Sequence, residues 1–277
     1  MQYHHIYHAG NFADVFKHCV LIMLVQTLCK KDKPFVFLDT HAGIGRYDVT
    51  SAMAQKTGEY QAGISVVYGF PDLVNAPDVI KTYVDLVRAQ NHQDAKKIAE
   101  SENTLHCYPG SPAIVQALLR PQDRMILVEL HQEDVKLLKQ EFAQDKRIAV
   151  HHANGYQSMK AFLPPKQGRG LILMDPAFED PNDFNNIIAA LKDGLERFPH
   201  GIYAVWYPIK DNLPIRDFQQ ELSFLGFQNV LLTEFSIGKV ATADTHLKRC
   251  GMAIINPPWQ FAEQLEPVIT WLEAVLC

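Results

Sequence analysis

The chain has 277 residues, of which 47% are hydrophobic and 21% charged, a composition that excludes extensive disorder and fibrous folds. With 26 Lys and Arg against 31 Asp and Glu, its net charge of -5 excludes a globally basic nucleic-acid-binding protein but not a local basic patch. The five cysteines are odd in number and form no C-x-x-C pair, which indicates reduced thiols in a cytoplasmic protein. The longest strongly apolar run, residues 19–25, is too short to span a bilayer, and the N-terminus shows no signal-peptide pattern, so we expect no membrane association.

The first predicted element is a helix over residues 12–30, with Asn11 as its N-cap and Asp14 in its first turn. The uninterrupted apolar run that follows, residues 35–38, is typical of a buried parallel strand. Similar runs cover residues 125–128, 148–150, 171–174, 202–206, 230–235 and 252–255, and helical patterns cover 132–144, 181–198 and 214–225. This alternation predicts an α/β fold with a doubly wound, mostly parallel seven-stranded sheet, in which ligands bind beyond the carboxyl ends of the strands.

A long gap separates the first two predicted strands. About 87 residues lie between Leu38 and Met125, far more than a crossover connection needs. Residues 51–104 are rich in helix-forming residues. We therefore expect a main domain of residues 1–50 and 105–277, with residues 51–104 as a helical insertion beside the ligand crevice.

Two features point to a nucleotide-like ligand. The loop of residues 39–45 follows the first strand, and its glycines, Gly43 among them, let the backbone approach a ligand closely; the strand is expected to place Asp39 at the crevice mouth. A plain strand-to-helix turn fits this loop equally well. Glu129 ends the second strand, where an acid typically accepts hydrogen bonds from ribose hydroxyls, although a solvated carboxylate is the alternative.

Residues 175–178, Asp-Pro-Ala-Phe, follow the strand at 171–174 and resemble the Asp/Asn-Pro-Pro-aromatic motif of amino-group methyltransferases. The exocyclic amine of adenine is a poor nucleophile because its lone pair is delocalised into the ring. The carboxylate of Asp175 and the carbonyl of Pro176 can accept hydrogen bonds from that amine and stabilise the charge that develops on nitrogen. Phe178 can stack on a base that has left its neighbours.

A second match, Asn256-Pro257-Pro258-Trp259, fits this motif more literally. It follows the last strand, whereas Asp175 ends the fourth, which is expected to lie beside the first. Asp also accepts hydrogen bonds as an anion, whereas Asn is neutral. We therefore assign the chemistry to Asp175 and a structural role to the motif at Asn256.

The N-terminal segment is rich in histidine, with His4, His5, His8 and His18. No acidic or cysteine ligands accompany them at spacings typical of metal sites, so we expect no metal. Solvated or capping histidines are one interpretation, and an RNA-facing patch of aromatic and basic groups is another.

Four segments together resemble the bacterial large-subunit ribosomal RNA adenine-N6 methyltransferases of the RlmJ family. They are residues 8–18, 38–47, 108–112 and 206–208, and the likeness extends from residue 3 to residue 259. It implies a class I Rossmann-like methyltransferase that uses S-adenosylmethionine. It also implies a catalytic acid at Asp175, which borders the cofactor, and RNA contacts at Tyr3 and Lys17. The cofactor contacts that it implies are His18, His41, Ser111, Glu129, Asn154 and Gly155.

The chain departs from the family pattern at three positions. Asn154 stands where Asp is frequent, and Ala177 and Phe178 stand where the family has Pro and Tyr. We expect methylation of the N6 amine of a specific adenine in large-subunit ribosomal RNA by a cytoplasmic monomer. A DNA adenine-N6 methyltransferase is one alternative, and a non-catalytic nucleic-acid-binding relative, suggested by Ala177, is the other.

Overall fold

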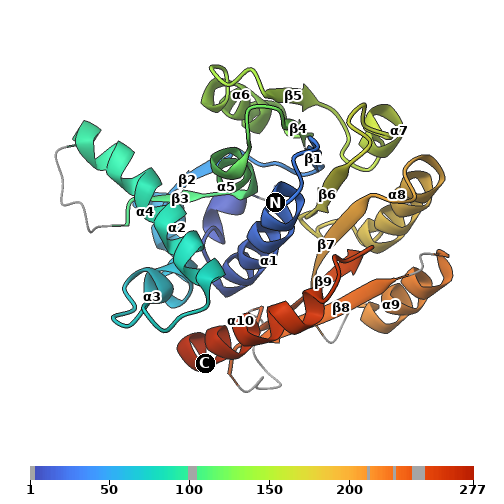
Figure 1. The fold of residues 1–277 in the computed structure, drawn as a ribbon. Helices are drawn as coiled ribbons and strands as arrows, with labels where there is room; N and C mark the ends of the chain where they lie inside the picture. The colour runs from blue at the N-terminus through green and yellow to red at the C-terminus, as the bar shows by residue number, and fades with distance from the viewer. Residues whose placement is uncertain (1–3, 99–104, 211–212, 227–228, 239–246) are drawn as a thin grey trace.

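The computed structural model describes residues 4–98, 105–210, 213–226, 229–238 and 247–277. A seven-stranded sheet in the order β5-β4-β1-β6-β7-β9-β8 forms its centre (Figure 1). The strands are β1 Val36–Asp39, β4 Arg124–Glu129, β5 Ile148–His152, β6 Gly170–Met174, β7 Ile202–Pro208, β8 Val230–Ser236 and β9 Arg249–Ile255. The five strands from β5 to β7 are parallel, and β9 is antiparallel to both β7 and β8. The predicted doubly wound, mostly parallel sheet is therefore confirmed.

Helices cover both faces of the sheet (Figure 1). Alternate side chains of each strand face opposite cores, so Phe37 and Leu38 of β1 belong to different clusters of buried residues. The cluster around Phe37 includes residues from α1 Phe12–Cys29, α5 Ser111–Leu118, α6 Gln132–Glu141 and α10 Phe261–Leu276. The cluster around Leu38 includes residues from α7 Ser158–Phe162, α8 Asp183–Arg197 and α9 Ile215–Phe224.

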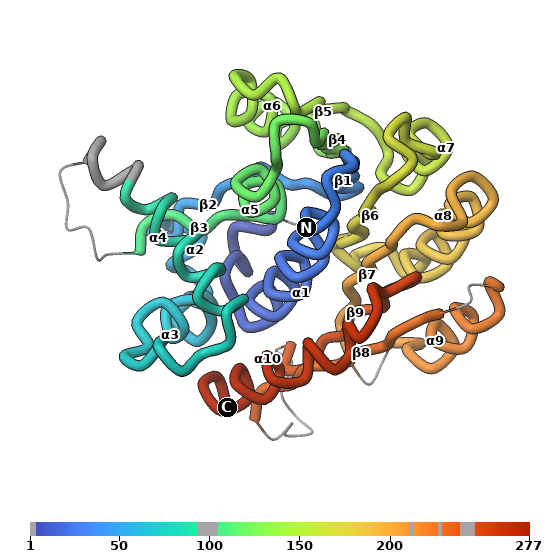
Figure 2. The backbone as a smooth tube through the Cα atoms, in the orientation of Figure 1, coloured from blue at the N-terminus to red at the C-terminus, as the bar shows by residue number. Residues whose placement is uncertain are grey.

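Helix α1 is apolar on nearly all sides. It is the one helix among the described residues that is long and apolar enough to cross a membrane, and 78% of it is buried inside the fold. It packs against α4, α5 and α10, so the blue and red ends of the chain lie side by side in Figure 2. Because α1 is largely buried, its apolar composition is that of a helix in the core of the fold.

The gap between β1 and β4 contains more than helices. Two short antiparallel strands, β2 Arg46–Asp48 and β3 Cys107–Pro109, flank the segment, and neither they nor α5 and α10 were predicted. Between them lie α2 Ala52–Thr57, the 3-10 helix η2 Glu59–Ala62, α3 Ile64–Tyr68 and α4 Asp78–Ile98; a further 3-10 helix, η1 His5–Tyr7, precedes α1. The buried side of α4, with Ile80, Tyr83 and Val87, shares the core of α1. That residues 51–104 form a separate subdomain stays a prediction.

Candidate active site

A cavity of about 1320 Å³ lies at the carboxyl ends of the parallel strands. Ten of the residues predicted from the sequence to form the site line it: Lys17, His18, His41, Gly43, Ser111, Glu129, Asn154, Asp175, Pro176 and Phe178. Gly155 does not line the cavity but directly follows Asn154 in the chain, and Tyr3 lies outside the described residues. The fold thus brings segments from the N-terminus to β7 into one site, as doubly wound sheets do at the point where strand order reverses.

The glycine loop after β1 needs its glycines. Gly43 has a φ of 60°, and a Cβ there would lie 2.2 Å from the Tyr47 hydroxyl. At Gly155, after β5, a Cβ would lie 2.0 Å from the backbone oxygen of Thr40 and 3.0 Å from Cε1 of His41. Two backbone segments therefore approach closely on one side of the cavity, which only residues without a Cβ allow.

The carboxylate of Glu129 fixes the glycine loop. One oxygen accepts a hydrogen bond from the backbone N–H of Gly43 at 2.8 Å, and the other accepts one from the backbone N–H of His131 at 2.7 Å. Each oxygen has a second lone pair available for a ligand hydroxyl. Asn154 is placed similarly after β5, where its side-chain oxygen accepts from the backbone N–H of Gln157 at 3.1 Å.

A chain of buried charges connects α1 to Asp175. The ammonium group of Lys17 donates to Asp14 at 2.6 Å and to Asp175 at 2.5 Å, and the two carboxylates flank it. Burial lowers the pKa of Lys17, but the two carboxylates outweigh burial, so the net shift is upward and the group stays charged. Lys17 is only 4% exposed, so its ammonium group is directed at Asp175 and not outward.

Asp14 is the second anchor of this chain. Burial raises its pKa, but Lys17 and His5 together hold the pKa well below the ordinary range. The same carboxylate accepts from Nε2 of His5 at 3.0 Å and from the backbone N–H of Gly10 at 2.9 Å. The predicted cap is confirmed, because the Asn11 side chain accepts from the backbone N–H of Asp14.

One placement predicted from the sequence is wrong. Asp39 does not lie at the mouth of the crevice: it is 0% exposed and accepts a hydrogen bond from the Ser111 hydroxyl at 2.7 Å. Ser111 begins α5, and this helix covers the end of β1 on the side to which Asp39 points. Burial, with the nearby Asp175 carboxylate, raises the pKa of Asp39 to about 7.

The two predicted cofactor histidines are neutral at physiological pH. His18 is 1% exposed, stacks on the ring of Tyr108 and bonds its hydroxyl at 2.7 Å; burial lowers the pKa of His18 to about 3. His41 lies edge-on to Tyr156 and near the Thr40 hydroxyl, and burial lowers the pKa of His41 to about 4. Within the part of the chain that the structure describes, no group of three His, Cys, Asp or Glu residues is placed to hold a metal ion.

Aromatic side chains stand beside Asp175. The ring centroid of Phe178 lies 4.9 Å from that of Phe184 and 5.8 Å from that of Trp206, and both Phe178 and Trp206 line the cavity. Phe178 has a φ of 54°, which non-glycine residues seldom adopt, and its ring packs against those of Phe184 and Trp206. A flat ring can therefore stack on an aromatic face next to a carboxylate.

The second Asp/Asn-Pro-Pro-aromatic match lies near the amino ends of the parallel strands, opposite the cavity. Because β9 runs antiparallel to β7, Ile255 pairs with Tyr203, near the start of β7. Asn256 follows there and donates to the backbone oxygens of Pro199 and Gly201. Trp259 is 86% exposed. This motif therefore closes a loop and does not line the cavity.

Three residues of the site were missed. The sequence placed Asp14 only in the first turn of a helix. His5 was named only as part of the histidine-rich segment, and Trp206 lay only within the segment 206–208 that resembles the family. Trp206 could have been found, because it lies near the carboxyl end of β7, next to β6. The contact between Lys17 and Asp175 spans 158 residues, and no local pattern indicates it.

The comparison with known proteins fits this geometry. The family model described as "Ribosomal RNA large subunit methyltransferase D, RlmJ" matches residues 32–277. The chain belongs to the RlmJ family. Two relatives named "Ribosomal RNA large subunit methyltransferase J" align with all of it and with 94% of their own lengths, one from Escherichia coli K12 at 40% identity and one from Haemophilus influenzae at 38%.

A solved structure also resembles this RlmJ-family chain. The crystal structure of a Legionella pneumophila protein has a TM-score of 0.84 to it at 33% sequence identity. The match covers 97% of this chain and 94% of that one. The likeness therefore includes the insertion between β2 and β3 as well as the sheet.

Proposed function

We propose that the chain methylates the exocyclic N6 amine of a specific adenine in large-subunit ribosomal RNA, with S-adenosylmethionine as methyl donor. Family membership supports ribosomal RNA methylation. The observation that carries the adenine assignment is the position of Asp175. Its carboxylate stands at the tip of β6, beside the glycine loop of β1, in a cavity with aromatic walls.

Asp175 orients the target amine in this proposal. Its Oδ2 is held by Lys17, and its Oδ1 makes no hydrogen bond among the described residues, so one oxygen remains to accept from the amine. The backbone oxygen of Pro176 accepts the second N–H. Both acceptors stabilise the positive charge that grows on nitrogen, and the ion pair with Lys17 holds the carboxylate in place. Phe178 stacks on the base, and Trp206 packs edge-on against Phe178.

The opposite side of the cavity fits the cofactor. S-adenosylmethionine supplies an electrophilic sulfonium methyl group when it is bound. Glu129 has free lone pairs for ribose hydroxyls, and Asn154 can accept from an adenine amine. Glycine at positions 43 and 155 avoids collisions with Tyr47 and with the Thr40 backbone, so the two loops lie close together on this side of the cavity. The neutral His18 and His41 add no charge there. A volume of about 1320 Å³ exceeds the usual size of a single-ligand pocket, so it suits a cofactor together with a base.

We also propose where the enzyme acts and in what oligomeric state. Its substrate is ribosomal RNA, so we propose that it acts in the cytoplasm, and that it acts as a monomer. We retain residues 51–104 as a helical subdomain at the side of the crevice.

The direct test is transfer of a labelled methyl group to unmodified large-subunit ribosomal RNA and to DNA of equal sequence. The proposal expects N6-methyladenine in the RNA and far slower transfer to the DNA. Equal or faster transfer to DNA would favour the DNA enzyme, and cofactor binding with no transfer to either would favour a non-catalytic protein.

The two look-alike motifs provide a matched pair of variants. Phe178→Leu removes the stacking face in the cavity, and we expect it to lower kcat/KM on RNA by about five- to hundredfold, because base stacking contributes roughly 1–3 kcal/mol. Trp259→Leu makes the same kind of change at the exposed aromatic of the other motif and should leave transfer unaltered. Equal losses in both would refute the assignment.

A further inference from the structure

The amino edge of the sheet, opposite the cavity, is strongly basic. The loops that lead into the four neighbouring strands β5, β4, β1 and β6, together with the first residue of β4, contain nine of the 26 Lys and Arg residues of the chain but only three of its 31 Asp and Glu residues. We call this surface the basic edge. It consists of Lys30, Lys31, Lys33, Arg120, Arg124, Lys146, Arg147, Lys166 and Arg169, with Asp32, Asp123 and Asp145.

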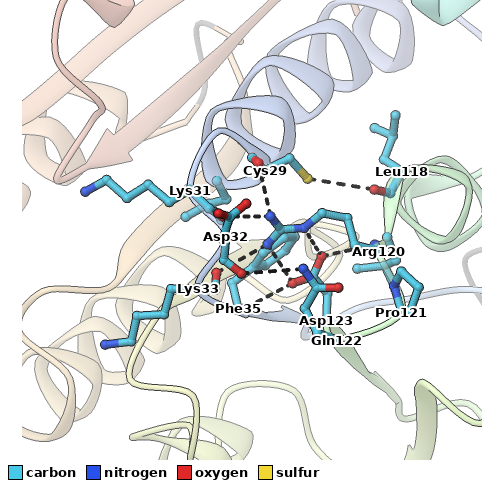
Figure 3. Close-up of polar contacts among 12 residues, drawn as sticks. Cys29, Lys31, Asp32, Lys33, Phe35, Leu118, Arg120, Pro121, Gln122 and Asp123 are labelled. Carbon is cyan, nitrogen blue, oxygen red and sulfur yellow. Dashed lines mark hydrogen bonds and ion pairs between the residues drawn. The ribbon is translucent and has the colours of Figure 1, made fainter.

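Two arginine side chains of the basic edge hold the loop between α1 and β1 in place (Figure 3). Arg120 donates to the backbone oxygens of Cys29, Lys31 and Lys33 and pairs with the fully buried Asp123. Arg169 adds bonds to the same loop, at the backbone oxygens of Leu28 and Lys33. The loop between α1 and β1 is therefore held from its inner side.

This clamp leaves the lysine side chains on the outside. In Figure 3 the side chains of Lys31 and Lys33 extend away from the Arg120 cluster. Lys30, Lys31 and Lys33 are all exposed, and their loop carries one acid, Asp32. The C-terminal dipole of α1 attracts cations only within its last turn, so it does not account for Lys146 or Lys166 on neighbouring loops. Exposed ammonium groups on a loop whose backbone is held in place, with few acids nearby, are suited to binding phosphates.

The cavity has the opposite charge. Ten acidic residues line it against three lysines: Asp14, Glu59, Glu129, Glu133, Asp134, Asp175, Glu179, Asp180, Asp183 and Asp193 against Lys17, Lys160 and Lys210. Lys17 is already neutralised by Asp14 and Asp175. A cavity of this kind can hold a base but repels the phosphates that come with it. Electrostatic affinity for a polyanion then has to come from another surface.

We infer that the basic edge binds the phosphate backbone of a segment of the RNA substrate that lies away from the target adenine. This inference rests on the proposed function and adds a second, sequence-independent contact to it. The strands between the two sites have four to six residues, so about 13–20 Å separates the edge from the cavity. A folded RNA spans that distance, whereas a short fragment around the target does not reach both sites.

The test compares two RNA lengths with the variant Lys31→Gln/Lys33→Gln. The backbone oxygens that hold the loop remain, so the fold is preserved. On full-length ribosomal RNA we expect KM to rise about three- to tenfold with kcat unchanged, and the slope of log affinity against log salt to fall by about 1.5. On the shortest fragment that is still methylated, KM should stay the same.

The control Lys139→Gln/Lys192→Gln removes the same charge from exposed positions on α6 and α8 and should change neither substrate. If the unaltered chain methylates RNA but the edge variant matches it on both lengths, this inference fails while the proposed function stands. A defect seen only with assembled ribosomal particles would indicate an acidic protein partner and would also overturn it. Absence of transfer by the unaltered chain would refute the proposed function itself.

Discussion

Replacing Lys17 by methionine removes the cation between two carboxylates. The side chain of Asp14 is 3% exposed and that of Lys17 5%, whereas that of Asp175 is 16% exposed and keeps contact with water. Most of the cost therefore falls on Asp14, which becomes a buried charge that keeps only His5 and the Gly10 backbone N–H as partners. Removal of one partner from a buried pair costs about 3–5 kcal/mol, and we expect the free energy of unfolding at pH 7 to fall by that amount.

The loss depends on pH with a definite sign. In the unaltered chain the pKa of Asp14 is depressed, so its contribution to stability is present above its unfolded value of 3.8 and is lost only as the pH falls through the lower folded value. Lys17→Met removes the cation that lowers the pKa of Asp14, so burial makes the charged form of Asp14 unfavourable. The difference in stability between the two chains should therefore shrink as the pH is lowered from 7 towards 4.

Denaturant unfolding followed by circular dichroism measures this difference, and Asp14→Asn/Lys17→Met separates stability from catalysis. Adding Asp14→Asn to Lys17→Met removes the uncompensated charge, so we expect the double variant to recover more than half of the lost stability. Methyl transfer should stay low, because Asp175 still lacks its cation. The reasoning is refuted if Lys17→Met unfolds within 1 kcal/mol of the unaltered chain, or if the double variant is no more stable than the single one.

Two further predictions concern the cofactor side. Since the pKa of Asp39 is raised to about 7, the stability it contributes is fully present below the unfolded value of 3.8 and is lost as the pH rises through 7. Between pH 4 and 8 the free energy of unfolding of the unaltered chain should fall by about 2–4 kcal/mol because of Asp39, and urea titrations of Asp39→Asn should show no such fall. The control Asp217→Asn replaces an exposed carboxylate and should keep the profile of the unaltered chain. The same profile for Asp39→Asn would contradict this prediction. Gly155→Ala places a Cβ against the Thr40 carbonyl and should raise the Kd for S-adenosylmethionine at least tenfold by calorimetry. Gly168→Ala, with no atom within 4 Å of its Cβ, should leave that Kd unchanged, and equal Kd values for both variants would refute the close-approach argument.

The sequence was sufficient for the sheet because its strands are continuous apolar runs. Both faces of β1 and β6 are covered by helices, so every residue in them is buried and the pattern is unmistakable. The strands β2 and β3 have three residues each and lack such a run. Their pairing depends on the fold around them, which short-range patterns do not encode.

The position of the site residues along the chain was also accessible, but their orientation was not. Strand alternation puts Asp39 on the face opposite Leu38, yet its burial follows from α5, which begins at Ser111 and was not predicted. For Lys17 the resemblance implied an RNA contact, which stays a prediction. Its contact with Asp175 depends on how α1 crosses the end of β6, a tertiary arrangement.

The most direct test of the account is the rate of methyl transfer to ribosomal RNA by Asp175→Ala at saturating cofactor. The substitution removes the acceptor at the strand tip, and Asp14 remains as partner to Lys17, so the fold should persist. Loss of one preorganised group that stabilises transition-state charge costs on the order of 10²–10³ in kcat. The account predicts a fall of that size with S-adenosylmethionine still bound, and a rate within tenfold of the unaltered chain would contradict it.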